Sequence, residues 1–278
     1  MMRFCAAAVC LVFALISNGV SAETYQTCKA FIDTVPAVVT TQGVYCLRSD
    51  LSTAQSTGAA ITVSTNNVTI DCNGFKIGGL AAGLNTNANG IEALYRQNTT
   101  VRNCNVRGFR SGIRVWGDGI LVENNSLDHN TENGVVVSGS ANRVRGNLVL
   151  NTGGTTLHSS VSGFLLGGDV DLSDNQVNGV FASGGNVSAY GVQHNSGVGA
   201  RMARNLVRNL VPSGTGDAFG IFSVSSLKVF IEDNRLSMEI PWPGSTAVRC
   251  NAGNGAMRDV TSWGFSSGNS GCVDDGGN

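Results

Sequence analysis

Five residues of the types that bind and polarise sugars lie close together in two sequence segments. Glu92 and Arg114 are 22 residues apart and each follows a Gly-Ile pair, while Tyr95, Trp116 and Asp118 come a few residues later. An aromatic ring covers the apolar face of a sugar, and charged groups hydrogen-bond its hydroxyls or a uronate. We predict substrate binding by Tyr95 and Trp116. The alternative is a surface ion pair beside aromatics that cover a strand end.

The remaining candidate chemistry is sparse. His129, His158 and His194 have no spacing that brings them together, so we expect them to face solvent. No zinc spacing, EF-hand pattern or repeated Asp motif occurs. We therefore predict no metal and no cofactor, although Asn- and Asp-rich turns offer oxygen ligands to Ca²⁺.

A glycine followed by an apolar residue recurs along the chain. Separations of 22, 22, 29, 28 and 29 residues indicate one supersecondary unit repeated many times. Ala60-Ile61 and Ala247-Val248 fit as weaker members. The strong members are Gly90-Ile91, Gly112-Ile113, Gly134-Val135, Gly163-Phe164, Gly191-Val192 and Gly220-Ile221.

A second anchor, aliphatic-x-x-Asn-x-aliphatic, recurs inside the units. Between the anchors, apolar residues alternate with a period of two in short stretches rich in Val and Ile, which predicts strands. Asn and Gly supply the left-handed backbone of turns, and a stacked Asn column can hydrogen-bond from coil to coil. The anchor asparagines are Asn73, Asn125, Asn147, Asn175, Asn205 and Asn234, with Cys104 in the same place in one unit.

The segments "GVYCLRSDLS" and "AITVSTNNVTIDCNGFKI" (43–52 and 60–77), together with the repeat over residues 55–265, resemble exported bacterial members of the right-handed parallel β-helix family. That family includes pectate lyases, polygalacturonases, alginate epimerases and phage tailspikes. The resemblance implies an all-β, single-domain, right-handed parallel β-helix of about eight coils. We divide the chain into a signal peptide (1–22), an N-terminal cap (23–58), the β-helix (59–265) and a C-terminal tail (266–278).

The first 22 residues follow the pattern of a secretory signal peptide, so we expect a secreted or periplasmic protein. Six cysteines remain after it, and an even number in an exported chain indicates disulfides. Six cysteines allow fifteen pairings, but stacked coils favour neighbours and staples at the exposed ends. We predict disulfides that join Cys28 to Cys46, Cys72 to Cys104 and Cys250 to Cys272.

Charged residues at the second anchor position alternate in sign, as expected of outward neighbours on adjacent parallel strands. They read Asp71, Arg102, Glu123, Arg145, then Glu232 and Arg258. The net charge is −1, which argues against nucleic acid as a partner, and no apolar run is long enough to predict a membrane span.

The fold alone does not assign an activity, because one β-helix architecture hosts many functions. The polygalacturonase and epimerase motifs are missing from the sequence. We therefore expect a protein that binds an extended polysaccharide or another cell-surface partner and has no evident catalytic motif. The alternative is a lyase, epimerase or glycoside hydrolase acting on a uronate-rich polymer, with Glu92, Arg114 and Asp118 as the best catalytic candidates. A purely structural envelope protein is a third possibility.

Overall fold

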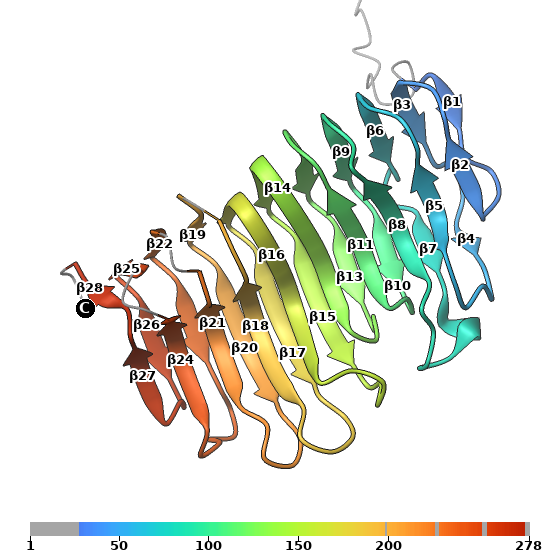
Figure 1. Cartoon of the computed structure of the whole chain (residues 1–278). Coiled ribbons are helices and arrows are strands. Elements are labelled where there is room, and N and C mark those ends of the chain that lie inside the picture. The colour runs from blue at the N-terminus through green and yellow to red at the C-terminus, as the bar shows by residue number, and fades with distance from the viewer. Residues whose placement is uncertain (1–27, 198, 226–227, 252–254, 276–278) are drawn as a thin grey trace, which may run out of the picture.

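The computed structural model describes residues 28–197, 199–225, 228–251 and 255–275. The chain winds as a parallel β-solenoid of about eight turns, running from the blue N-terminal coils to the red C-terminal coils in Figure 1. Every pair of named strands is parallel. The predicted fold class is confirmed. The predicted signal peptide, residues 1–22, lies outside the described residues.

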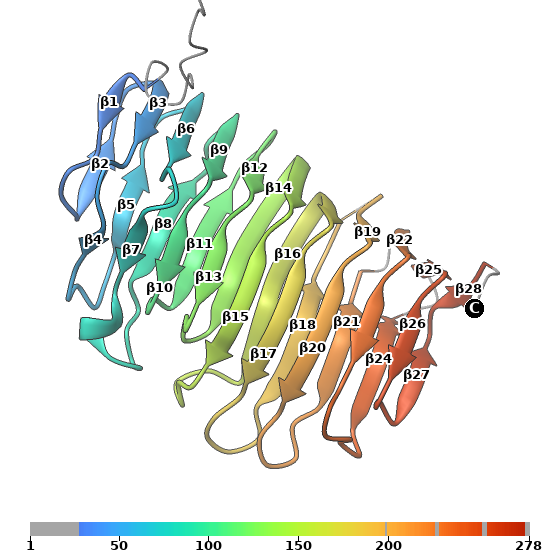
Figure 2. The same ribbon diagram turned by 180° about the vertical axis from the view of Figure 1, so that it is seen from behind.

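Each coil contributes one strand to each of three faces. The first face carries the Gly-aliphatic repeat, and the same stacked strands are seen from behind in Figure 2. Its strands are β2 (Ala37–Val39), β5 (Ala59–Val63), β8 (Asn89–Leu94), β11 (Ser111–Trp116), the first half of β14 (Asn133–Arg145) and of β16 (Ser160–Ser173), β18 (Ser188–His194), β21 (Ala218–Ser223), β24 (Ser245–Cys250) and β27 (Ser267–Ser270).

The second and third faces follow in each coil. The second face consists of β1 (Ala30–Phe31), β3 (Gly43–Cys46), β6 (Val68–Asp71), β9 (Thr99–Arg102), β12 (Leu121–Glu123), the second halves of β14 and β16, β19 (Arg201–Ala203), β22 (Val229–Glu232), β25 (Gly255–Arg258) and β28 (Val273–Asp274). The third face consists of β4 (Leu51–Ser52), β7 (Lys76–Gly78), β10 (Asn105–Arg107), β13 (Ser126–Asp128), β15 (Leu148–Gly153), β17 (Gln176–Phe181), β20 (Leu206–Val211), β23 (Arg235–Ser237) and β26 (Thr261–Trp263).

Parallel pairing extends past the predicted β-helix range of 59–265 in both directions. Strand β2 pairs with β5 inside the predicted N-terminal cap, and β27 pairs with β24 inside the predicted tail. A short 3₁₀ helix, η2 (Leu80–Ala82), interrupts the strands between β7 and β8.

The aliphatic residues of the Gly-aliphatic repeat form a continuous buried column. Each is opposite its counterpart in the next coil and has no solvent-accessible surface, so the core runs along the solenoid axis. The column comprises Ile61, Ile91, Ile113, Val135, Phe164, Val192, Ile221 and Val248.

The repeated glycines are required by close packing inside the strands. A Cβ on Gly90 would lie 2.4 Å from the carbonyl oxygen of Gly112, and one on Gly163 would lie 2.7 Å from that of Gly191. Their φ angles are not among the positive ones, so these glycines do not serve turns. At these glycines a Cβ would therefore meet the backbone of the next coil, whereas alanine occupies the same position at Ala60 and Ala247.

The asparagines form the expected ladder between the second and third faces. The side-chain oxygen of each accepts the backbone N–H of the preceding member, and the side-chain nitrogen donates to neighbouring coils. The ladder runs through Asn125, Asn147, Asn175, Asn205 and Asn234, and Cys104 stands one coil before it, donating its N–H to Asn125. Asn73 does not belong to this column, because its Oδ1 is buried without a hydrogen-bond partner, whereas the Oδ1 of each ladder asparagine accepts a backbone N–H.

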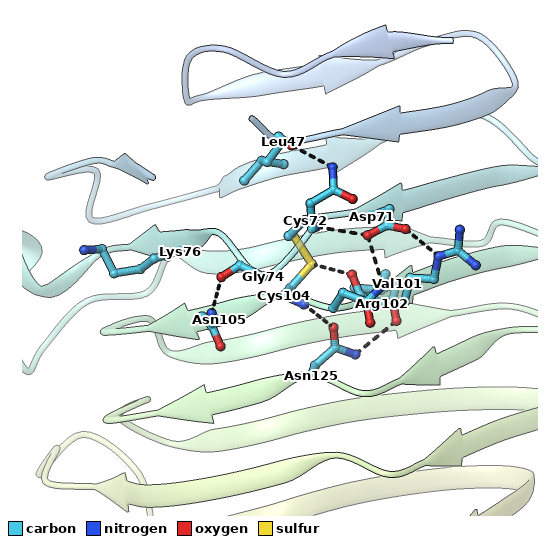
Figure 3. Close-up of a disulfide and its surroundings, with 12 residues drawn as sticks. Leu47, Asp71, Cys72, Gly74, Lys76, Val101, Arg102, Cys104, Asn105 and Asn125 are labelled. Atoms are coloured by element: carbon cyan, nitrogen blue, oxygen red, sulfur yellow. Dashed lines mark hydrogen bonds and ion pairs between the residues drawn. A yellow bond between two sulfur atoms is a disulfide. The ribbon is translucent and has the colours of Figure 1, made fainter. Parts of the chain in front are cut away.

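The three predicted disulfides are present: Cys28–Cys46, Cys72–Cys104 and Cys250–Cys272. The first and last lie near the ends of the solenoid. Figure 3 shows the middle one, which links adjacent coils beside the start of the Asn ladder.

The predicted charge alternation is also present, with partners opposite each other on neighbouring second-face strands. The ion pairs measure 2.7 Å for Asp71–Arg102, 2.8 Å for Glu123–Arg145 and 3.0 Å for Glu232–Arg258.

Candidate functional site

Glu92 and Arg114 lie opposite each other on the first face, on β8 and β11. Arg114 Nη1 is 3.1 Å from Glu92 Oε2, and the same oxygen accepts a hydrogen bond of 2.8 Å from Asn89 Nδ2. The parallel register places both side chains outward because they alternate with buried Ile91 and Ile113. Both charges are therefore held in fixed positions by neighbours.

Two aromatic rings extend this pair along the first face. The Arg114 guanidinium lies 4.3 Å from the centre of the Trp116 ring, and the Tyr95 ring meets Trp116 edge-on at 5.9 Å. Tyr95 has a φ of 57° at the end of β8 and 76% of its surface is exposed. The left-handed backbone turns its ring out of the strand. The structure thus brings together Glu92, Arg114, Trp116 and Tyr95, which we call the first-face ledge.

Asp118 lies apart from the first-face ledge. It is an exposed residue of the turn that follows β11, and its Oδ1 accepts a hydrogen bond of 2.8 Å from the backbone N–H of Ser140 in the next coil. Among the described residues it forms no ion pair with Arg114. The carboxylate stabilises a turn in this structure.

The arrangement of the first-face ledge suits binding more than proton transfer. The carboxylate of Glu92 is occupied by two donors and Arg114 is shared between that carboxylate and an aromatic face. An exposed ring next to fixed, partly buried charges offers a sugar an apolar contact and hydrogen-bonding groups at low entropic cost.

A second group of polar residues at the edge of the same face was missed by sequence reasoning. Arg110 Nε and His158 Nε2 both contact Glu132 Oε2, the latter at 3.5 Å. His158 belongs to the insertion between β15 and β16, which lies outside the repeat. The sequence therefore does not indicate which residue of a neighbouring coil His158 lies beside. No sequence signal therefore placed its side chain beside Glu132.

The expectation that all histidines face solvent is wrong for His194, which has no exposed surface. Its Nε2 donates to Gly168 O at 3.2 Å, because a carbonyl only accepts, and its Nδ1 then accepts from the Ser223 hydroxyl at 3.1 Å. Burial lowers the pKa of this imidazole. His194 lies two residues after the inward Val192 and opposite the buried Leu166, so the alternation along β18 turns its side chain toward the core.

Aromatic residues also gather further along the first face. Tyr190, Phe219 and Phe222 stack on one another with ring centres 4.8–5.6 Å apart, and Arg249 lies over the two phenylalanines. Burial raises the pKa of Tyr190. Because these rings pack against each other, their faces are less available to a ligand than the exposed ring of Tyr95.

A cavity of about 640 Å³ lies elsewhere, at the turn between the second and third faces, where Asn105, Asn124 and Ser126 contribute to its wall. Sequence reasoning missed it, since the glycine and asparagine content of a turn does not show whether neighbouring turns leave a hollow.

Neither metal ligands nor a membrane-spanning helix emerge from the described part of the chain. No group of three or more His, Cys, Asp or Glu side chains there is placed to hold a metal ion. No helix within that part is long and apolar enough to cross a membrane. The predicted lack of a cofactor stays a prediction.

Two solved structures of known proteins are similar to this chain. The crystal structure of the Agl-KA catalytic domain is similar at 12% identity, covering 84% of this chain and 58% of that one, with a TM-score of 0.44. The catalytic domain of a GH87 α-1,3-glucanase in complex with tetrasaccharides is similar at 13% identity over 88% and 63%, with a TM-score of 0.28. The chain spans less than two thirds of either structure, and these values do not bear on activity.

No curated protein matches the chain. The model of the right-handed β-helix region, by contrast, matches residues 37–207, which is more than half of the sequence. This match agrees with the parallel solenoid, its inward aliphatic column and its Asn ladder. The chain belongs to the right-handed β-helix family.

Proposed function

We propose that this protein binds an extended polysaccharide at the first-face ledge and does so without catalysis. The observation that carries the proposal is the position of Arg114, fixed between Glu92 and the Trp116 ring, beside the exposed ring of Tyr95. A prepositioned cation and an open aromatic ring give a sugar both polar and apolar contacts. The paired state of both charges favours binding over acid–base chemistry.

The same proposal includes export. Three disulfides in one chain are typical of proteins that fold in oxidising compartments, and this supports a secreted or periplasmic location. A polysaccharide of the cell surface or surroundings is a partner that such a protein meets.

The test is retention of the protein on a panel of immobilised polysaccharides that includes uronate-rich polymers. We expect Trp116→Ala to weaken retention about tenfold or more, since a buried or partly buried aromatic anchor contributes strongly to binding. Trp263→Ala is the matched control, because Trp263 is an exposed tryptophan on the third face, away from the first-face ledge. Circular dichroism of both variants reports the fold.

Equal retention of wild type and Trp116→Ala on every polymer that binds would contradict the proposal. The same panel is monitored for unsaturated sugar ends by absorbance and for reducing sugars. Release of either product by the wild type would instead favour the enzyme, and Glu92→Gln would then test whether the ledge carries the chemistry.

A further inference from the structure

Three adjoining open hollows follow one another along the third face. The cavity of about 640 Å³ adjoins a hollow of about 350 Å³ that shares Gly74, Asn105 and Ser126 with it. That hollow in turn shares Lys76 and Arg107 with a third one of about 430 Å³. Together they cross the coils from β4 to β15, and we call this surface the third-face groove.

The groove exists because one turn is longer than its neighbours. Four residues separate Asp71 from Lys76, whereas two separate Arg102 from Asn105, although both ends of these segments are paired in register. The longer turn includes Gly74, which lines two of the hollows, and we call this turn the wall of the groove. The wall is fixed by the Cys72–Cys104 disulfide and by a hydrogen bond from Asn105 Nδ2 to Gly74 O (Figure 3).

Part of the groove lining consists of amide and hydroxyl groups that both donate and accept hydrogen bonds. Within the described residues, the side chains of Asn124 and Ser126 form no hydrogen bond, and Asn73 Oδ1 is buried without a partner. This contrasts with Asn125, one residue from Asn124, whose amide is fully engaged in the ladder. Unused amide and hydroxyl groups beside a hollow match the hydroxyls of a sugar, which also donate and accept.

The charges of the groove cancel. Lys76 lies 3.1 Å from Asp50, and Arg107 lies 3.5 Å from Asp128. Because each cation is already paired with a carboxylate, neither is free to attract an anionic polymer. Removing water from these ion pairs would not favour the binding of an anionic polymer either. The wall chemistry therefore selects a neutral ligand.

The repeat distance favours a chain over a single sugar. Outward side chains recur about every 4.8 Å from coil to coil, which is the spacing of paired strands. One unit of an extended pyranose chain has a similar length, so each coil of the groove can meet one unit. We propose that the third-face groove binds a neutral oligosaccharide chain, independently of the first-face ledge.

The test is isothermal titration of the full chain with neutral hexasaccharides (cellohexaose, xylohexaose and mannohexaose), with oligogalacturonate as the charged comparison. The double variant Asn124→Gly and Ser126→Ala removes both unused side chains without breaking an internal hydrogen bond. Gly146 already occupies the place of Asn124 in the next coil at a φ of 63°, so glycine fits there. We expect at least one neutral hexasaccharide to bind, and the double variant to bind it about tenfold or more weakly.

Gln176→Ala is the matched control, because Gln176 is exposed in the same outward column of the third face but does not line the groove. Its affinity should equal that of the wild type. Absence of binding by all three neutral hexasaccharides would overturn the proposal. So would a double variant that binds as tightly as Gln176→Ala.

Discussion

Single side chains in this molecule act on two coils at once. Asn175 illustrates this, since its Oδ1 accepts from the backbone and side-chain nitrogens of Asn147 while its Nδ2 donates to Val144 O and Ser173 O. It also donates its backbone N–H to Asn205. A buried amide in this position satisfies turn backbone that water cannot reach.

Replacing Asn175 with alanine should therefore lower the free energy of unfolding by about 3 kcal/mol or more, because several buried groups lose their partner at about 1–3 kcal/mol each. Urea denaturation measures the change. The exposed Asn178 provides the control, and its alanine variant should lose less than about 1 kcal/mol. A similar, small loss in both variants would show that the ladder contributes little.

The stability of the fold depends on pH through the side chain of His194. Its folded-state pKa is lowered by burial, so the unfolded chain binds a proton before the folded chain does. The stability is complete above the ordinary histidine pKa of 6.5 and falls as the pH drops below it.

We expect the melting temperature to decrease between pH 7 and pH 5 in the wild type and to decrease less in His194→Gln. For one proton, the free energy of unfolding changes by at most about 1.4 kcal/mol per pH unit. Thermal denaturation followed by circular dichroism measures it, with the exposed His129→Ala as control. A wild-type slope that persists in His194→Gln would assign the pH dependence to other groups.

At the scale of elements, the turn between β6 and β7 and its disulfide shape the third-face groove. The cross-link between Cys72 and Cys104 joins two adjacent coils that are already paired, so it restrains the wall rather than creating the solenoid.

The double variant Cys72→Ser and Cys104→Ser should keep its β-sheet circular dichroism and lose about 2–4 kcal/mol of stability, as expected for a closed loop of this size. In the titration above, its affinity for the neutral hexasaccharide should fall, while retention of polysaccharide at the first-face ledge should not. Unchanged binding of the neutral chain would show that the wall stands without the disulfide.

The sequence allowed prediction of those contacts that join equivalent positions of neighbouring coils. The Asn ladder, the alternating charges of Asp71 and Arg102, and the nearest-neighbour disulfides all follow from stacking one coil on the next. Features outside the register could not be predicted. The contact of His158 with Glu132 depends on an insertion, and the third-face groove depends on four residues in a turn where the next coil has two.

The glycine repeat was predicted as a marker of coils, but its physical reason appeared only in the structure. Turn glycines tolerate positive φ, whereas the glycines of the first face lie inside strands at close approach between coils. Sequence periodicity alone does not separate these two causes, since both select the residue without a side chain.

The described part of the molecule is an elongated solenoid with two separate candidate binding surfaces (Figure 1). The first-face ledge carries paired charges and the exposed ring of Tyr95, and the third-face groove carries amides and hydroxyls together with two ion pairs. Because the β-solenoid fixes both surfaces, we expect ligands to bind without large changes in backbone conformation.

Hydrogen–deuterium exchange of the protein with and without the best-retained polysaccharide fragment tests the central claim most directly. The account predicts slower exchange in peptides that cover residues 89–96 and 111–118, with peptides from residues 218–223 and 245–250 unchanged. Protection confined to those later coils, or no protection on the first face at a saturating concentration of the fragment, would contradict it.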